Sequence, residues 1–221
     1  RIGISDGKQI PIYTGGKLSG QIGNYEIGFI QTQTRSVDNI KGENFSVARV
    51  KRPFFKQSYL GLVFTDRSTR EGNIDSLSLD QTLYGADLEL KTSEFLGDKN
   101  LQFQSFFVFH SAPMFNNDLS ISDLSTRGLR ITYPNDIIRT HVSYREFGDM
   151  YSPSLGFSRR NGFKRIQPSF SYNPRPQKLD FIRQIEIGIS YENMTDLNDR
   201  MLKKQTTLTP FNIRFESQDE I

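Results

Sequence analysis

The sequence predicts an all-β protein, an antiparallel up-and-down transmembrane β-barrel of which about eleven strands are visible. Three observations predict this fold class. Eleven short stretches alternate polar with apolar residues, and the connections between them alternate tight turns with longer polar loops. No apolar run approaches the roughly 20 residues that a membrane-spanning helix needs. Because every second connection of such a barrel lies at the same rim, we expect the turns at one rim and the loops at the other.

The predicted strands follow one another along the chain. They are Ile12 to Ile22, Tyr25 to Thr34, Phe45 to Arg52, Tyr59 to Asp66, Leu83 to Thr92, Leu101 to His110, Gly128 to Tyr133, Ile138 to Arg145, Arg165 to Tyr172, Gln184 to Tyr191 and Thr209 to Phe215. Side chains alternate with period two, so in the strand 83–92 Tyr84 and Leu88 lie on one face and Asp87 and Glu89 on the other. The pattern is weakest in 45–52, where neither face is purely apolar.

Tight turns and longer loops separate these strands. The predicted turns are Gly23-Asn24, Arg52 to Lys56, Ser93 to Asn100, Pro134 to Asp136 and Asn173 to Leu179. The longer loops include those around Gly72, Asn117 and Asn198. Bacterial single-chain barrels have even strand numbers, so we expect these eleven strands to belong to a larger barrel.

Composition separates this fold from its rivals. The mean hydropathy is −0.53, yet the chain holds 18 Phe and 9 Tyr, a balance that suits a barrel with one lipid face and one wet face. Cysteine is absent, which excludes disulfides and thiolate metal sites. The net charge of +3 comes from 28 basic and 25 acidic residues that are interspersed. A nucleic-acid surface needs a basic stripe, so nucleic acid is not an expected partner.

We expect one domain over residues 1–221, because no linker or composition break divides the chain. The sequence opens at Arg1 without the signal peptide that an exported protein carries. We therefore expect a fragment of a longer protein.

Four runs resemble a known family: 10–34 (IPIYTGGKLSGQIGNYEIGFIQTQT), 44–67 (NFSVARVKRPFFKQSYLGLVFTDR), 83–109 (LYGADLELKTSEFLGDKNLQFQSFFVF) and 133–176. The family is an uncharacterised C-terminal outer-membrane barrel domain of Gram-negative bacteria, usually found behind a family-9-like carbohydrate-binding module. The resemblance implies an outer-membrane location, the lipid bilayer as partner and a sugar-binding β-sandwich upstream of Arg1. Glycan binding would belong to that missing sandwich. The resemblance supplies no catalytic motif and no cofactor.

Ten charged or histidine side chains on the predicted inner face are candidates for lining a lumen. They are Lys17, Asp87, Glu89, Lys91, Arg130, Arg139, His141, Arg145, Arg165 and Glu186. Basic side chains along a narrow aqueous path favour anions. Because three carboxylates share this face, mixed salt bridges are the alternative to an anion path.

Three other groups of residues could form a functional site but can also be explained by an ordinary structural role. Asp87 and Glu89 share a face as glycosidase carboxylates might, but with Lys91 they also form a ladder of compensating charges. His110 and His141 both point inward on strands that are about 10 Å apart, too far for shared metal coordination without further ligands. Oxygen-bearing side chains at 116–118, with Asp123, could bind a hard cation or form a solvated loop.

The predicted function is passage, docking or presentation of an attached, possibly carbohydrate-binding module by an outer-membrane barrel. The alternatives are a soluble all-β binding domain, whose apolar faces would meet in a core, and a component of a glycan-processing enzyme. A requirement for detergent during purification distinguishes the membrane barrel from the soluble binding domain. Cleavage of glycan distinguishes the enzyme component from the barrel and from the soluble domain. The sequence shows no group of residues arranged for catalysis.

Overall fold

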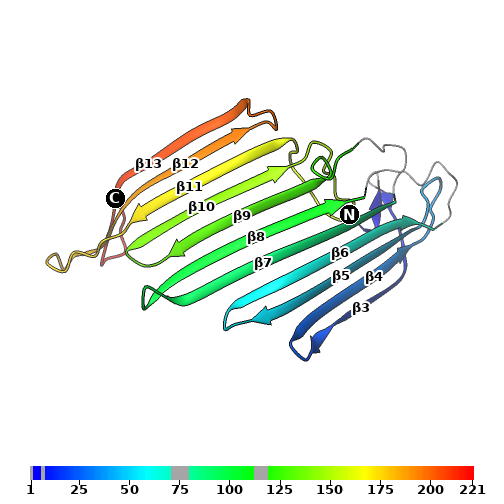
Figure 1. Cartoon of the computed structure of the whole chain (residues 1–221), viewed down its shortest axis with the longest axis horizontal. Helices are drawn as coiled ribbons and strands as arrows, with labels where there is room; N and C mark the ends of the chain where they lie inside the picture. Colours follow the sequence, from blue (N-terminus) through cyan, green and yellow to red (C-terminus); the bar gives the residue numbers. More distant parts are fainter. Residues whose placement is uncertain (1, 6–7, 71–79, 112–118) are drawn as a thin grey trace. The chain divides into compact units, whose positions relative to one another are not determined.

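The computed structural model describes residues 2–5, 8–70, 80–111 and 119–221. Eleven antiparallel strands follow one another in a single sheet in chain order, from β3 to β13 (Figure 1). Two short strands, β1 (Ile4–Ser5) and β2 (Lys8–Gln9), pair only with each other. None of the described segments is a helix, so the fold is all-β.

The described residues contain no helix long and apolar enough to cross a membrane.

The strands of the main sheet are long. They are β3 (Ile12–Ile22), β4 (Tyr25–Thr34), β5 (Glu43–Phe54), β6 (Ser58–Thr69), β7 (Gln81–Phe95), β8 (Lys99–His110), β9 (Ser125–Pro134), β10 (Ile138–Phe147), β11 (Phe163–Tyr172), β12 (Ile182–Thr195) and β13 (Met201–Phe215).

The eleven predicted strands are confirmed, including the weakest one at 45–52, which is β5. Several extend further than their apolar pattern. In the last hairpin this extension makes the long-loop prediction wrong: Asn193 still pairs with Lys204 and Met194 with Lys203, so only residues 196–200 connect β12 to β13. Backbone pairing continues there beyond the apolar residues that marked the strand.

The contacts group the chain into two compact units. Unit 1 holds Arg1–Leu88, Phe106–Arg127 and Phe147–Asn161, and unit 2 holds Glu89–Ser105, Gly128–Glu146 and Gly162–Ile221. In both units we call the strand ends that carry the predicted tight turns the turn ends. The opposite ends, which carry the predicted loops, are the loop ends.

In unit 1 the pairing of strands sorts side chains by polarity. Paired residues point to the same face, and Leu18 pairs with Phe29, Phe29 with Ala48, and Val50 with Leu62. We call this the apolar face; its larger members Leu18, Phe29, Val50 and Leu62 are exposed, Leu62 by 55%. The neighbouring positions form the polar face, where Gly28 pairs with Arg49, Lys51 with Gly61, and Phe45 with Arg67.

Unit 2 shows the same separation of faces. On its apolar face Phe170 pairs with Ile189 and Ile189 with Leu208, and all three are exposed, Ile189 by 45%. On its polar face Ser190 pairs with both Ser169 and Thr207. The period-two pattern of the sequence therefore describes the faces of both units correctly.

Buried hydrophobic side chains are few and lie at the loop ends. Among the described residues they are Ile10, Phe45, Leu83, Leu124, Tyr151 and Phe163. Ile10 precedes β3, Leu124 precedes β9, and Tyr151 lies in the connection from β10 to β11; the others lie within the first three residues of their strands. The middle of each strand thus has no hydrophobic core on its apolar side.

The strand order has two ends, β3 and β13, and the pairings of the described residues do not join them. The antiparallel, chain-order arrangement is as predicted, but these strands form an open sheet.

Candidate functional site

On the polar face of unit 1, an ion pair crosses a strand. Arg49 on β5 contacts Asp87 on β7 through two parallel interactions, Nη1 to Oδ1 at 2.5 Å and Nη2 to Oδ2 at 2.9 Å. The pair passes over Gly61 of the intervening β6, where a Cβ would lie 2.5 Å from Arg49 Nη2 and 2.7 Å from Asp87 Oδ1. Tyr59 also donates to Asp87. Glycine at 61 therefore leaves the space in which the bidentate pair forms.

We expect Arg49 and Asp87 to be energetically coupled. In a double-mutant cycle of Arg49→Gln and Asp87→Asn, the coupling should be about 1 kcal/mol, because the pair is bidentate and only partly exposed. Equilibrium urea unfolding in detergent measures it. The Glu192–Lys203 pair, with one contact of 3.1 Å and a 47% exposed lysine, is the matched control and should give less than about 0.5 kcal/mol. Equal couplings would contradict the role of bidentate geometry.

Glu89 has one partner on its own strand, β7, and another on the neighbouring strand, β8. It contacts Lys91 Nζ at 2.5 Å and accepts a hydrogen bond from Gln104 Nε2 at 2.5 Å. With Asp87 bound to Arg49, each carboxylate has a cationic partner. This favours the charge-ladder reading over an acid/base pair, although the partner of Asp87 is Arg49 and not Lys91.

A loop segment lies over the polar face at the loop ends of β7 and β8. His110 is only 3% exposed; its Nε2 accepts the Ser152 N–H at 3.1 Å, and its Nδ1 lies 2.9 Å from the Ser111 carbonyl, to which it donates. Gln81 bonds the same segment, donating to the Ser152 carbonyl at 3.0 Å and accepting the Ser154 N–H at 2.5 Å. His110 and Gln81 thus clamp residues 150–154, which we call the inner loop.

The base of the inner loop packs on the connection before β9. Gly148 N–H donates to the Ser125 carbonyl at 2.8 Å, and a Cβ on Gly148 would overlap the carbonyl oxygens of Ser122 and Asp123. Hydrogen bonds from Ser120 lower the pKa of Asp123. Tyr151 packs on His110, with ring centroids 5.7 Å apart, and burial raises the pKa of its phenol.

The polar face of unit 2 carries a cluster of basic side chains beside a cavity. Arg130 and His141 line the cavity, which measures about 320 Å³, and Gln167 and Glu192 line its other part together with serine and threonine hydroxyls. His141 Nδ1 lies 2.7 Å from Ser169 Oγ. The charges of Arg130 and Arg165 both act on Arg145. The cluster therefore combines several cations with neutral hydrogen-bonding groups.

The other predicted residues are more isolated. Lys17 pairs with Ile30 on the polar face of unit 1, and Glu186 accepts a long hydrogen bond of 3.5 Å from Ser171. Arg139 is exposed. The candidate cation ligands at 116–118 lie outside the described residues. Within the described ranges, no three His, Cys, Asp or Glu side chains gather as they would around a metal ion.

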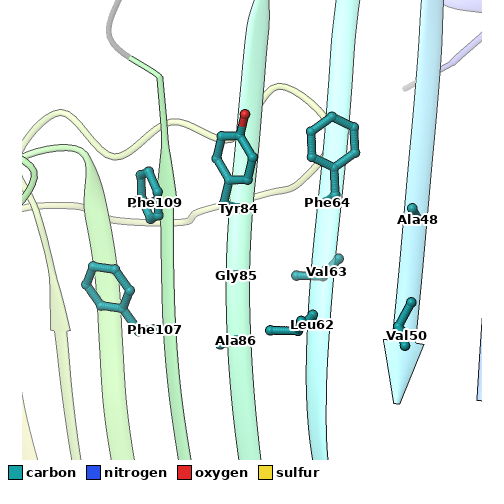
Figure 2. A pocket seen from close by; sticks show the side chains of 10 residues that line it. All are labelled: Ala48, Val50, Leu62, Val63, Phe64, Tyr84, Gly85, Ala86, Phe107 and Phe109. Atoms are coloured by element: carbon teal, nitrogen blue, oxygen red, sulfur yellow. The ribbon is translucent and has the colours of Figure 1, made fainter. Parts of the chain in front are cut away.

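The apolar face of unit 1 contains a shallow groove of about 400 Å³. Figure 2 shows a row of rings from Phe64, Tyr84 and Phe109 above it, with neighbouring ring centroids 5.4 Å apart. The small side chains of Ala48 and Ala86 also line the groove (Figure 2). Among the lining residues, Tyr84 alone has a polar side chain, so the groove suits apolar groups.

Several of these residues were missed by sequence reasoning. Arg49 lies in the strand with the weakest pattern, and its partner depends on a glycine in between. Glu192 and Lys203 lie beyond the predicted ends of their strands, although their opposite charges across a hairpin are a detectable signal. The contacts of His110 with the inner loop leave no local pattern.

The chain matches no protein-family model, no curated protein and no solved structure. The resemblance drawn from the four sequence runs therefore stays a prediction.

Proposed function

We propose that this chain is part of an outer-membrane β-barrel protein whose role is passage, docking or presentation of an attached module. In this proposal the apolar faces contact lipid and the polar faces line an aqueous interior. The attached module would be a carbohydrate-binding one, as the resemblance implies. The bilayer is the partner, and no cofactor is required.

The observation that carries the proposal is the exposed apolar face in each unit. A soluble domain would cover such a face, because each Leu, Ile or Phe side chain left in water forgoes about 1.5–3 kcal/mol of burial free energy. Leu62, Phe29, Ile189 and Phe170 are all exposed, while the buried hydrophobic residues of the described chain lie at the loop ends. Lipid is the solvent in which this distribution is stable.

The dimensions of the apolar face support the same proposal. Strands rise about 3.3 Å per residue, so Leu101 to Phe109 on β8 spans about 26 Å, close to the lipid-facing band of known barrels. The band ends in polar groups at the loop ends, where Thr82 donates to Asp66 at 3.0 Å. Four tyrosines of the apolar faces lie within three residues of a strand end, as interfacial belts require: they are Tyr84, Tyr133, Tyr144 and Tyr172. Tyr191 lies further from the end of its strand, because β12 extends to Thr195.

A pair of single tryptophans tests the proposal cleanly, because the natural chain has none. Ile189→Trp and Ser190→Trp place the reporter on opposite faces of one strand. In liposomes of acyl-brominated phosphatidylcholine, Trp fluorescence of Ile189→Trp should be quenched strongly by the lipid. That of Ser190→Trp should instead be quenched by aqueous iodide. The physical reason is that adjacent residues of a spanning strand meet different solvents.

Quenching that is equal for both variants would reject the assignment of faces. A protein that purifies without detergent and shows no lipid quenching at Ile189→Trp would favour the soluble all-β binding domain. Conductance of the inserted full-length protein in a planar bilayer then separates passage from docking. In a conducting protein, the inner loop held by His110 would narrow the path at the loop end of unit 1.

A further inference from the structure

Three arginines on the polar face of unit 2 have no ionic partner among the residues that the structure describes. Within the described part of the chain, Arg130, Arg145 and Arg165 form neither an ion pair nor a hydrogen bond through their side chains. Glu192, whose charge acts on Arg165, is already bound to Lys203 Nζ at 3.1 Å and to Gln167 Nε2 at 2.8 Å. Unit 1 differs, since its polar-face Arg49 and Arg67 are both paired with carboxylates.

The register of β10 and β11 brings two of these arginines together. The Asn173 N–H donates to the Ile137 carbonyl at 2.6 Å, and His141 contacts Ser169 at 2.7 Å. Both contacts fit one antiparallel register. Four residues further along it, Arg145 lies opposite Arg165. Like charges directly opposite each other on a sheet are destabilising, so this arrangement calls for a counter-charge.

The neighbouring cavity supplies groups that would hold a polar solute. Arg130 and His141 form its basic side, and its hydroxyl and amide groups come from Ser169, Ser190, Thr207, Gln167 and Gln205. Guanidinium groups bind phosphate and carboxylate oxygens in pairs, with shorter and stronger hydrogen bonds than neutral donors make. Hydroxyls and amides bind the uncharged polar part of such a solute.

We propose that Arg130, Arg145 and Arg165, with the adjoining cavity, bind an oxyanion: a polar solute that carries a phosphate, sulfate or carboxylate group. The site deepens the proposed function, because it names the solute class that the polar face of unit 2 recognises. It rests on the membrane proposal only in requiring that this face meets water.

The test uses the whole chain in detergent micelles, with inorganic pyrophosphate as the probe. Pyrophosphate should raise the melting temperature more than sodium chloride of equal ionic strength does. In the double variant Arg145→Gln, Arg165→Gln, the affinity for pyrophosphate should fall about tenfold or more, since charge-assisted hydrogen bonds are lost. The same variant should melt at a higher temperature than the natural chain in the absence of pyrophosphate, because the facing like charges are gone.

The control variant Arg159→Gln, Arg160→Gln removes the same net charge from the exposed connection between β10 and β11. It should retain the affinity of the natural chain. The proposal is overturned if pyrophosphate acts no better than sodium chloride, if the cluster variant binds as well as the natural chain, or if the control loses as much. Binding by a chain that fails the lipid-quenching test would support the oxyanion site and reject the barrel. A chain that inserts in lipid but responds to pyrophosphate no more than to sodium chloride would support the barrel and reject the oxyanion site.

Discussion

Replacing Leu88 by Arg is expected to destabilise the membrane-inserted protein by about 2–4 kcal/mol if Leu88 lies near the bilayer midplane. Leu88 lies between Ala86 and Leu90 on the apolar side of β7, in the middle of its apolar run. A charged side chain at that depth is held in hydrocarbon or must drag water and head groups toward it. Reversible urea unfolding in liposomes, followed by circular dichroism, measures the loss.

The neighbouring substitution Glu89→Arg should cost much less, because position 89 faces the polar side. Glu89→Arg does remove the contacts of Glu89 with Lys91 and Gln104. A second pair of substitutions, at Ile189 and Ser190, therefore gives a cleaner comparison. Ile189→Arg should behave like Leu88→Arg. Ser190→Arg introduces the same group on the polar face beside Glu192 in the unit 2 cavity. If both members of each pair lose the same stability, the lipid-facing assignment is wrong.

Replacing Gly148 by Ala is expected to release the inner loop. The added methyl group overlaps the carbonyl oxygens of Ser122 and Asp123, and these are backbone atoms rather than the end of a flexible side chain that could move away. Overpacking of this kind costs about 1–3 kcal/mol. Because His110 and Gln81 hold the loop only while its base is seated, cleavage between residues 148 and 161 by a nonspecific protease should become several times faster.

Gly28→Ala is the matched control. A methyl group at Gly28 meets no atom within 4 Å, so this variant should unfold like the natural chain or slightly later, as glycine replacements at compatible positions do. Protection of the inner loop that is unchanged in Gly148→Ala would show that the packing against Ser122 and Asp123 does not hold it. Global unfolding of Gly148→Ala, detected as lost strand signal, would show instead that the loop base is part of the folding unit.

Sequence reasoning found what depends on local alternation. The strand from Leu83 to Thr92 was predicted from side chains two apart, and the same alternation correctly separates Asp87 and Glu89 from Tyr84 and Leu88. These features need no knowledge of neighbouring strands, because the period of a strand fixes its two faces. Four of the five tight turns were likewise visible, although the strands extend into three of these four, to Phe54, Phe95 and Pro134. The fifth, predicted at Asn173 to Leu179, is wrong: residues 173–181 connect β11 to β12, so this connection is longer than the one at 196–200 and the alternation of short and long connections fails in the last two hairpins.

The contacts that could not be predicted from the sequence depend on the register between strands and on the conformation of the loops. The Arg49–Asp87 pair requires a glycine on the strand between them, and the meeting of Arg145 with Arg165 follows from contacts at Asn173 and Ser169, far along the same pair of strands. A one-residue slip would separate these charges while leaving every strand pattern intact. The inner loop contains Pro153 and polar residues typical of any solvated loop.

In the proposed barrel, the direction of the two end strands would constrain where an attached module sits. Because neighbours alternate in direction from β3 to β13, these two strands run the same way, so β3 begins at the loop ends and β13 finishes at the turn ends. An all-antiparallel barrel containing them needs an odd number of additional strands. If long loops face the cell exterior, as is usual, a module joined directly to β3 would be displayed outside the cell. A single closing strand placed before β3 would move that junction to the periplasmic side, so the position of the closing strand decides which compartment the module samples.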